Sequence, residues 1–89
     1  MKVKNDFISR TIADEHLLIP TGEAALRVKG LISLSESGAF LYQKLCNDCT
    51  RDDLVSALTA EYDVPVSVAE ADIDAFLEQM RQLDMLVEE

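Results

Sequence analysis

The hydrophobic pattern of this chain changes period near residue 35, and that change limits the folds that the chain can adopt. Before residue 35, apolar residues occur in short runs of the kind found in strands: FISRTIA at 7–13, HLLI at 16–19 and LISL at 31–34. After it, apolar residues recur every three or four positions, as they do on the buried face of a helix. Strands followed by helices with short connections indicate an α+β domain, with a small sheet packed on or beside the helices.

The three apolar runs predict a three-stranded antiparallel sheet. Phe7–Ala13 and His16–Ile19 flank two polar residues, Asp14–Glu15, which we interpret as the turn of a β-hairpin. The segment 24–29 (AALRVK) fits neither a strand nor a helix clearly. The third strand is expected at Leu31–Leu34, where the apolar run ends directly at a cluster of small polar residues.

Two of the three expected helices follow these strands. The first covers about Glu36–Cys46, where apolar residues fall at four-residue spacings. The second opens at Thr50–Asp53, which has the spacing of a capping box, with Cys49 and Leu54 at the positions of a hydrophobic staple. This helix is expected to stop before Val64-Pro65, because the residue that precedes a proline disfavours the helical conformation.

The third expected helix has the clearest pattern in the chain. Ser67–Glu70 is a second capping box and marks its expected start. The acidic residues 70, 72 and 74 then fall in its first turns, where the helix dipole favours negative charge. Its buried face is expected to carry the apolar residues at i, i+3, i+4, i+7 and i+10: Ile73, Phe76, Leu77, Met80 and Leu83.

Length and charge restrict the function. The 89 residues, 48% of them hydrophobic, suffice for a single domain over residues 1–89 with one core. The net charge is −9, and residues 52–89 contain eleven acidic residues against Arg81 alone. An acidic surface repels phosphate groups, so nucleic acid is not an expected partner. Since no transmembrane stretch or signal-peptide pattern is present, we expect a cytoplasmic protein that does not enter a membrane.

Few residues in the chain are suited to catalysis or metal binding. Cys46 and Cys49 form a C-x-x-C motif, but a structural zinc site needs four ligands and the chain adds only His16. We interpret Cys46 as a small core residue and Cys49 as part of the hydrophobic staple. No serine or cysteine nucleophile is paired with His16, and the chain has no glycine-rich phosphate loop. We therefore expect no enzymatic activity, no metal and no cofactor.

Five short segments of the chain form an ordered set. They are LSESGAFLY at 34–42, TRDDLV at 50–55, EYDV at 61–64, DIDAFL at 72–77 and LDML at 83–86. Taken together over about residues 31–87, they resemble the PqqD-like family, the recognition elements for precursors of ribosomally synthesised and post-translationally modified peptides (RiPPs). Each segment alone is a weak signal, and the specificity comes from their order and spacing.

The chain departs from the family pattern at a few positions. Ser35 stands where Asn is usual, and serine also caps a helix. Tyr42 replaces the usual Trp and still supplies an aromatic side chain. Asp84 replaces the usual Gly after the last helix, and Asp accepts a left-handed backbone conformation better than most residues. Family members of the pyrroloquinoline quinone (PQQ) pathway usually carry an aromatic-Pro-Glu-Gly run before the third strand, where this chain has TGEA at 21–24.

The resemblance implies a winged-helix-like domain, a three-stranded antiparallel sheet followed by three helices. It also implies a non-catalytic protein that binds the leader of a RiPP precursor peptide and presents it to a modifying enzyme, such as a radical-SAM protein, a cyclase or a protease. In the family, the leader adds as a strand to the third strand and lies against the third helix. Asp72 is then expected to pair with a basic leader residue. The expected peptide-binding residues are Leu31, Ile32, Ser33, Leu34, Asp72, Ala75, Phe76, Gln79 and Leu83.

Three other functions remain as alternatives. A winged-helix DNA-binding regulator would need a basic recognition helix, whereas Ser67–Leu83 contains four acidic residues and Arg81. A small acidic carrier protein would need an Asp-Ser-Leu tripeptide at a helix start, and the chain contains none. The third alternative is the peptide chaperone of PQQ biosynthesis itself. An exposed edge strand would also permit a homodimer by strand exchange.

Overall fold

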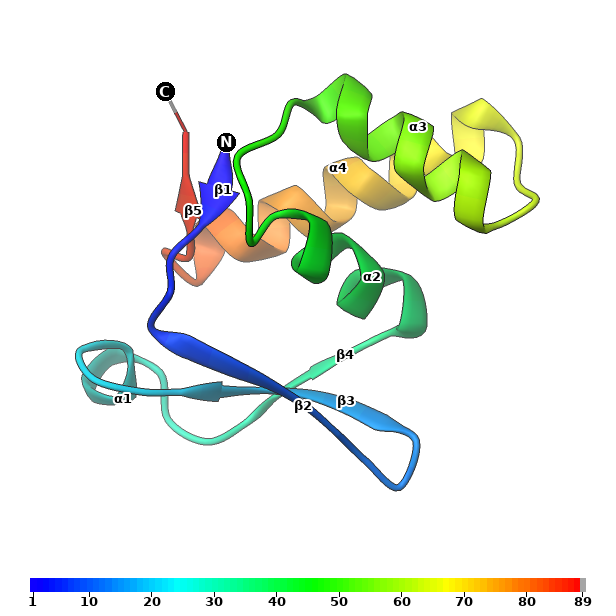
Figure 1. Cartoon of the computed structure of the whole chain (residues 1–89). Helices are drawn as coiled ribbons and strands as arrows, with labels where there is room; N and C mark the ends of the chain where they lie inside the picture. Colours follow the sequence, from blue (N-terminus) through cyan, green and yellow to red (C-terminus); the bar gives the residue numbers. More distant parts are fainter. Residues whose placement is uncertain (89) are drawn as a thin grey trace.

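The computed structural model of the chain describes residues 1–88. Figure 1 shows the three longer helices packed together over a small sheet, with residues 2–3 and 86–87 side by side. In chain order the elements are β1 (Lys2–Val3), β2 (Phe7–Ile12), β3 (Glu15–Pro20), α1 (Ala24–Arg27), β4 (Ile32–Leu34), α2 (Glu36–Lys44), α3 (Arg51–Glu61), α4 (Val66–Gln82) and β5 (Leu86–Val87).

The expected α+β fold with a three-stranded antiparallel sheet is confirmed. The strand order is β2-β3-β4, so β4 lies at one edge of the sheet. The third strand begins at Ile32, one residue later than expected, and Leu31 lies outside it with 58% of its surface exposed. Residues 1–88 contain four helices rather than three, because the ambiguous segment 24–29 forms the single turn of α1.

The turn of the hairpin lies one residue earlier than expected. Ala13 (φ 51°) and Asp14 (φ 65°) occupy its two central positions, and Ile12 pairs with Glu15. A two-residue hairpin needs positive φ at both positions so that its twist matches that of the strands. This register places Thr11 opposite His16, where their side chains form a 3.1 Å hydrogen bond. The expected Asp14–Glu15 turn was therefore wrong, because the cross-strand pairing selects a different register.

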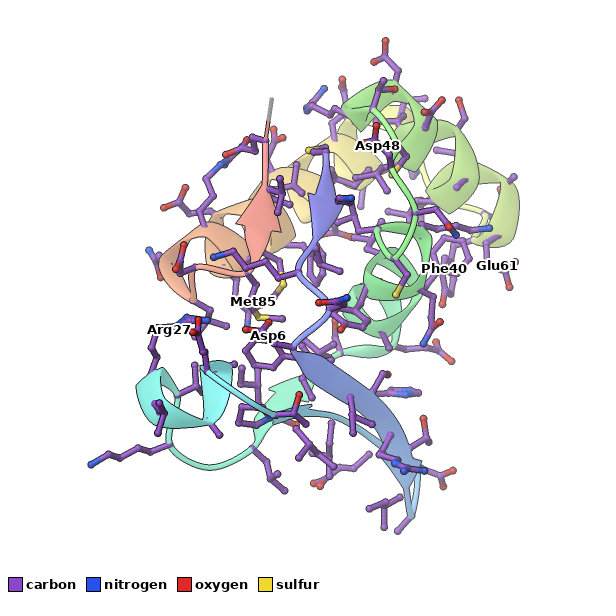
Figure 2. The ribbon with its side chains drawn as sticks, turned by 60° about the vertical axis from the view of Figure 1, so that its left-hand side comes forward. Asp6, Arg27, Phe40, Asp48, Glu61 and Met85 are labelled. Atoms are coloured by element: carbon purple, nitrogen blue, oxygen red, sulfur yellow. The ribbon has the colours of Figure 1, made fainter. Side chains whose placement is uncertain are left out.

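Ion pairs join helix α1 to the segment before β2 and to the turn after α4. Arg27 Nη2 lies 3.4 Å from Asp6 Oδ2, and Arg27 Nη1 lies 3.6 Å from Asp84 Oδ2. Figure 2 shows Arg27 beside Asp6, close to Met85. All three charged groups are partly exposed, so each pair contributes little to stability on its own. Together they connect α1 with the segment before β2 and the turn after α4.

One hydrophobic core lies between the inner face of the sheet and helices α2, α3 and α4. Most of the expected inward face of the third helix is confirmed: Ile73, Phe76, Leu77 and Met80 are buried, while Leu83 is half-buried. The sheet adds Leu18 and Leu34, and the other helices add Leu41, Leu45, Leu54 and Leu58. Among the helices of residues 1–88, none has the length and apolarity needed to cross a bilayer.

The first two longer helices begin as expected. Ser35 caps α2, since its Oγ accepts a hydrogen bond from the N–H of Gly38 (3.1 Å), and the Thr50–Asp53 capping box of α3 is formed in full. Helix α2 stops at Lys44, two residues earlier than expected. The interpretation of Cys46 as a core residue was wrong, because Leu45 takes the core position (0% exposed) and leaves Cys46 exposed.

Helix α4 begins at Val66, and Pro65 is its N-cap. The expected start at the Ser67–Glu70 box was wrong, because the carbonyl of Pro65 accepts the N–H of Ala69 (3.0 Å) and no side chain caps the helix. Ala69, which is fully buried, lies one turn before Ile73 on the core face. The earlier start adds Val66 and Ser67 to the helix. It also leaves the first turn without acidic residues, so the expected dipole effect of residues 70, 72 and 74 is not realised there.

The end of α4 is a Schellman motif. The Met85 N–H donates to the Met80 carbonyl (2.9 Å), and the Asp84 N–H donates to the Arg81 carbonyl (3.0 Å). Asp84 has φ 55°, so the left-handed conformation expected at this position is confirmed. The chain then enters β5, which pairs antiparallel with β1. We did not expect this two-stranded sheet, because strands of two residues are too short to give a periodic pattern.

Candidate peptide-binding groove

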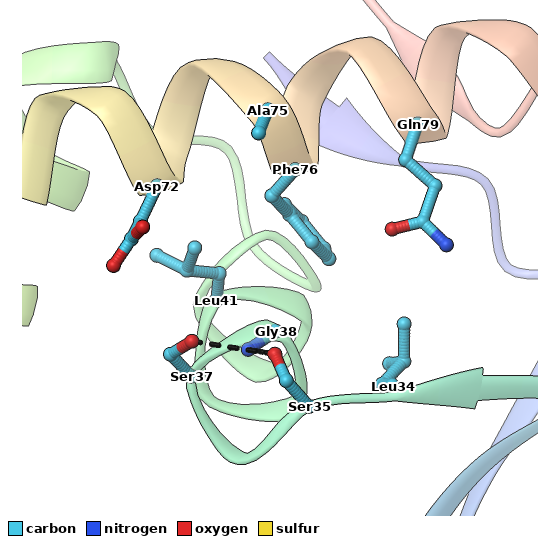
Figure 3. Close-up of a pocket in the computed structure, with 9 residues that line it drawn as sticks. All are labelled: Leu34, Ser35, Ser37, Gly38, Leu41, Asp72, Ala75, Phe76 and Gln79. Carbon is cyan, nitrogen blue, oxygen red and sulfur yellow. Dashed lines mark hydrogen bonds between the residues drawn. The ribbon is translucent and has the colours of Figure 1, made fainter.

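A groove of about 210 Å³ lies between α4 and the corner where β4 joins α2. Figure 3 shows its walls facing one another, α4 on one side and the first turn of α2 on the other. The residues that line it come from both walls and from the end of the edge strand: Leu34, Ser35, Ser37, Gly38, Leu41, Asp72, Ala75, Phe76 and Gln79.

The α4 wall is one face of a regular helix. Asp72, Ala75, Phe76 and Gln79 are spaced at i, i+3, i+4 and i+7, so their side chains leave the helix on the same side. Phe76 is only 5% exposed and forms the apolar floor, while the other three are exposed at the rim. Ala75 is short, so it leaves room above the Phe76 ring for a side chain from a bound molecule.

The opposite wall depends on small residues at the start of α2. Ser35 Oγ accepts the Gly38 N–H and lies 3.3 Å from Ser37 Oγ. A Cβ atom on Gly38 would lie 3.1 Å from Ser35 Oγ and 3.7 Å from the Phe76 ring. The absence of a side chain at Gly38 therefore lets the first turn of α2 close on its own cap, while the Phe76 ring of the α4 wall lies at ordinary contact distance.

The outer edge of β4 presents an unpaired backbone. Hydrogen-bonded pairs alternate along antiparallel strands, and the bond from the Thr21 N–H to the Asp6 carbonyl (2.8 Å) sets that alternation for the sheet. It follows that Leu18 bonds to Ile32, whereas the N–H and C=O of Ser33 point away from β3. No other strand in residues 1–88 pairs with this edge. Ser33 is thus free to pair with an added strand.

The structure gathers most of the expected site residues in one region. Five of the nine line the groove: Leu34, Asp72, Ala75, Phe76 and Gln79. Ile32 and Ser33 lie on β4 itself, next to the groove. Leu31 precedes the strand, and Leu83 lies at the C-cap of α4, where it packs against the core.

The sequence analysis did not assign four groove residues to the site. Ser35, Ser37, Gly38 and Leu41 were treated as parts of a corner and of a helix. The available signal was a serine cap followed three residues later by a glycine on the inner face of an amphipathic helix. Glycine at such a position indicates a close approach of another element.

The acidic residues of α4 differ in their partners. Arg51 of α3 donates to both carboxylate oxygens of Asp74 (2.8 and 2.9 Å) and to Glu70 (3.4 Å). The hydrogen bonds from Arg51 lower the pKa of Asp74 below its usual value. Asp72 makes no ion pair or hydrogen bond with the side chains described in residues 1–88. Its carboxylate faces the groove and is available to a ligand.

The two cysteines and the histidine of residues 1–88 are not brought together in the fold. In the described part of the chain, no three His, Cys, Asp or Glu side chains are grouped to hold a metal ion. Cys46 and Cys49 are both free thiols, and Cys49 packs against the core in the staple position. His16 is engaged with Thr11 across the hairpin.

Two solved structures resemble this chain over nearly its whole length. One is TbiB1 in complex with the TbiA(beta) leader peptide, with 25% identity and a TM-score of 0.77, covering 100% of this chain and 98% of that one. The other is a lasso peptide synthetase B1 complexed with the leader peptide, with 20% identity and a TM-score of 0.73, covering 98% of this chain and 96% of that one. At that identity, the second likeness shows the shared fold alone.

The sequence itself matches a known family. No curated protein sequence matches the chain significantly. A family model described as coenzyme PQQ synthesis protein D (PqqD) matches residues 15–86, from the second strand of the hairpin to the start of β5. This match covers the edge strand and both walls of the groove. The chain belongs to the PqqD family.

Proposed function

We propose that this protein is a non-catalytic recognition protein that binds the leader of a RiPP precursor peptide. The observation that carries the proposal is the position of the unpaired edge of β4 directly beside the groove. An edge strand and an adjoining groove are the two parts needed to bind a peptide by strand addition. The likeness to TbiB1, whose structure was solved with a leader peptide, supports the same use of this fold.

In the proposed complex, the leader extends the sheet. The N–H and C=O of Ser33 form hydrogen bonds with the leader backbone, which give affinity for almost any extended sequence. Alternate leader side chains point to the inner face of the sheet and enter the groove, where Ala75 and Phe76 receive apolar groups. Leu31 and Leu83 contact residues at the ends of the bound segment, and Gln79 is available to hydrogen-bond its backbone.

Binding of the leader serves a separate enzyme. A recognition protein without catalytic groups acts by raising the local concentration of the precursor near a modifying enzyme, such as a radical-SAM protein, a cyclase or a protease. The same β4 edge would serve a homodimer by strand exchange, and such a dimer would compete with the leader. The description of the family model makes the precursor peptide of PQQ biosynthesis one candidate ligand to test.

Isothermal titration calorimetry with synthetic leader peptides tests the proposal. The peptides come from short precursor genes that neighbour this gene, and the PQQ precursor is included. We expect one peptide to bind with a Kd on the order of micromolar, about −8 kcal/mol. If none of the leader peptides gave a binding heat at micromolar concentrations, the proposal would be contradicted.

A matched pair of variants tests the strand-addition mechanism. Ser33→Pro removes the outward N–H without removing a bond to β3, since proline is tolerated at the open side of an edge strand. Ser33→Ala keeps the backbone and changes only the side chain. We expect a loss of about tenfold or more in affinity for the proline variant alone. Equal affinities for both variants would exclude pairing at Ser33.

A further inference from the structure

A second cavity, of about 320 Å³, continues the groove beyond the carboxyl end of β4. It shares Ser35, Ser37 and Asp72 with the groove, so the two form one path past the start of α2. Its remaining walls come from α2, from the inner side of α3 and from the segment after α3: Glu36, Leu58, Tyr62 and Val64.

The lining of this cavity is apolar at one side and acidic at the other. Leu58 is buried, and Tyr62 and Val64 are half-buried against the core. The Tyr62 ring is fixed by an edge-to-face contact with Phe40 (5.7 Å between centroids, 85° between planes). Burial, and after it the charges of Glu36 and Glu61, raises the pKa of Tyr62. Glu36 lines the same cavity as Tyr62.

The two carboxylates of the cavity have no basic partner among the side chains of residues 1–88. Within residues 1–88, neither Glu36 nor Asp72 takes part in an ion pair or a side-chain hydrogen bond. No Lys or Arg of residues 1–88 lines this cavity. On the helices that form it, Lys44 lies over the Phe40 ring at 5.3 Å and Arg51 donates to Asp74. A cation for this cavity therefore has to come from another molecule.

We infer that this cavity receives one basic side chain, Lys or Arg, of the bound peptide, and that Glu36 and Asp72 select for it. The inference rests on the proposed function. The aliphatic stem of Lys or Arg would pack on the apolar side while its cation lies between the carboxylates, as long basic side chains do at apolar surfaces. An apolar side chain would desolvate the carboxylates without compensation, and an acidic one would be repelled.

The position of the cavity also places the basic residue within the peptide. The cavity adjoins Ser35 and Glu36, which follow β4, whereas strand pairing is centred on Ser33. The paired segment of the peptide has one end next to the start of α2. The basic residue is therefore expected just beyond that end of the peptide, outside the paired segment. Apolar selectivity in the groove and basic selectivity in the cavity then act at different peptide positions.

Selection from a displayed library of random linear peptides tests the inference. Three proteins are used: wild type, Glu36→Gln/Asp72→Asn, and the control Asp52→Asn/Glu78→Gln, which removes the same two charges from exposed positions outside the site. We expect Lys or Arg to be enriched at one position among peptides bound by wild type and control, and not by the cavity variant. Wild-type binders with no basic preference, or a preference that survives in the cavity variant, would overturn the cavity assignment.

This design separates the inference from the function on which it rests. If wild type selects no peptides at all, the proposed peptide-binding function fails rather than the cavity assignment. If peptides bind, one selected peptide is remade with its basic residue replaced by Met, which keeps length and apolar stem. We expect this change to weaken binding to wild type about threefold to tenfold and to leave the cavity variant unaffected. Equal losses for both proteins would contradict a charge contact at Glu36 and Asp72.

Discussion

The two flanks of α4 carry similar acidic side chains but use them differently. On the flank that faces α3, Glu70 and Asp74 are paired with Arg51, and the charges hold two helices of the same chain together. On the flank that faces β4, Asp72 has no partner within residues 1–88 and lines both the groove and the adjoining cavity. The comparison shows that amino-acid composition does not distinguish acidic side chains used for packing from those available for binding. The two kinds differ in whether the carboxylate has an intramolecular partner.

The largest expected effect comes from the groove floor, where binding and stability depend on the same residue. Phe76 is 5% exposed and belongs to the core. Phe76→Ala is expected to lower the free energy of unfolding by about 3–5 kcal/mol, because it leaves a cavity under the groove. Urea unfolding followed by circular dichroism measures this change. A loss below about 1 kcal/mol would show that the floor is not part of the core.

The groove rim should affect binding without affecting stability. Ala75→Leu fills the space above Phe76 from an exposed position, so we expect leader affinity to fall about tenfold or more, while the unfolding midpoint stays within error. Ala71→Leu is the matched control, because Ala71 is also exposed on α4 and does not line the groove. Similar affinities for the two variants would place the peptide elsewhere.

Charge reversal compares the two flanks directly. Asp72→Lys is expected to weaken binding of a leader with a basic residue about tenfold and to leave Tm nearly unchanged. Asp74→Lys is expected to do the opposite, since it breaks the contact with Arg51 and places two cations together. Calorimetry and thermal melting of both variants provide the two readouts. If both substitutions changed the same property, the proposed division of the helix would be wrong.

The smallest expected effect is a pH dependence on the α3-facing flank. The pKa of Asp74 is lowered in the folded protein, so its carboxylate stabilises the fold above the usual aspartate range. That stabilisation is lost as pH falls through the lowered pKa. The Tm difference between wild type and Asp74→Asn should therefore shrink towards zero in acid. A difference that persists under strongly acidic conditions would show that Arg51 does not act on the ionised form.

Much of the fold follows from local patterns. The strand runs, the helical periodicity after residue 35, the Thr50–Asp53 box and the left-handed residue at Asp84 all reflect local backbone chemistry, and the structure contains each of them. The face of α4 that meets the groove was also predictable, because a helix places residues at i, i+3, i+4 and i+7 together.

Features that depend on tertiary packing were not predictable in the same way. Ser67–Glu70 has the letters of a capping box, yet Pro65 is the N-cap and the helix begins at Val66, two residues before the start that a Ser67 cap would give. The pairing of β1 with β5 joins segments from opposite ends of the chain and leaves no periodic signal. The cavity at Glu36 is formed by α2, α3, α4 and the segment after α3, so only their packing brings its apolar and acidic sides together.

Backbone amide hydrogen exchange at β4 tests strand addition most directly. In the free protein, the Ile32 and Leu34 amides are bonded to β3, whereas the Ser33 amide points to the open edge. We predict that a saturating leader peptide protects the Ser33 amide strongly, with much smaller changes at Ile32 and Leu34. An unchanged exchange rate at Ser33 in a saturated complex would contradict the proposal that this protein reads its peptide as an added strand.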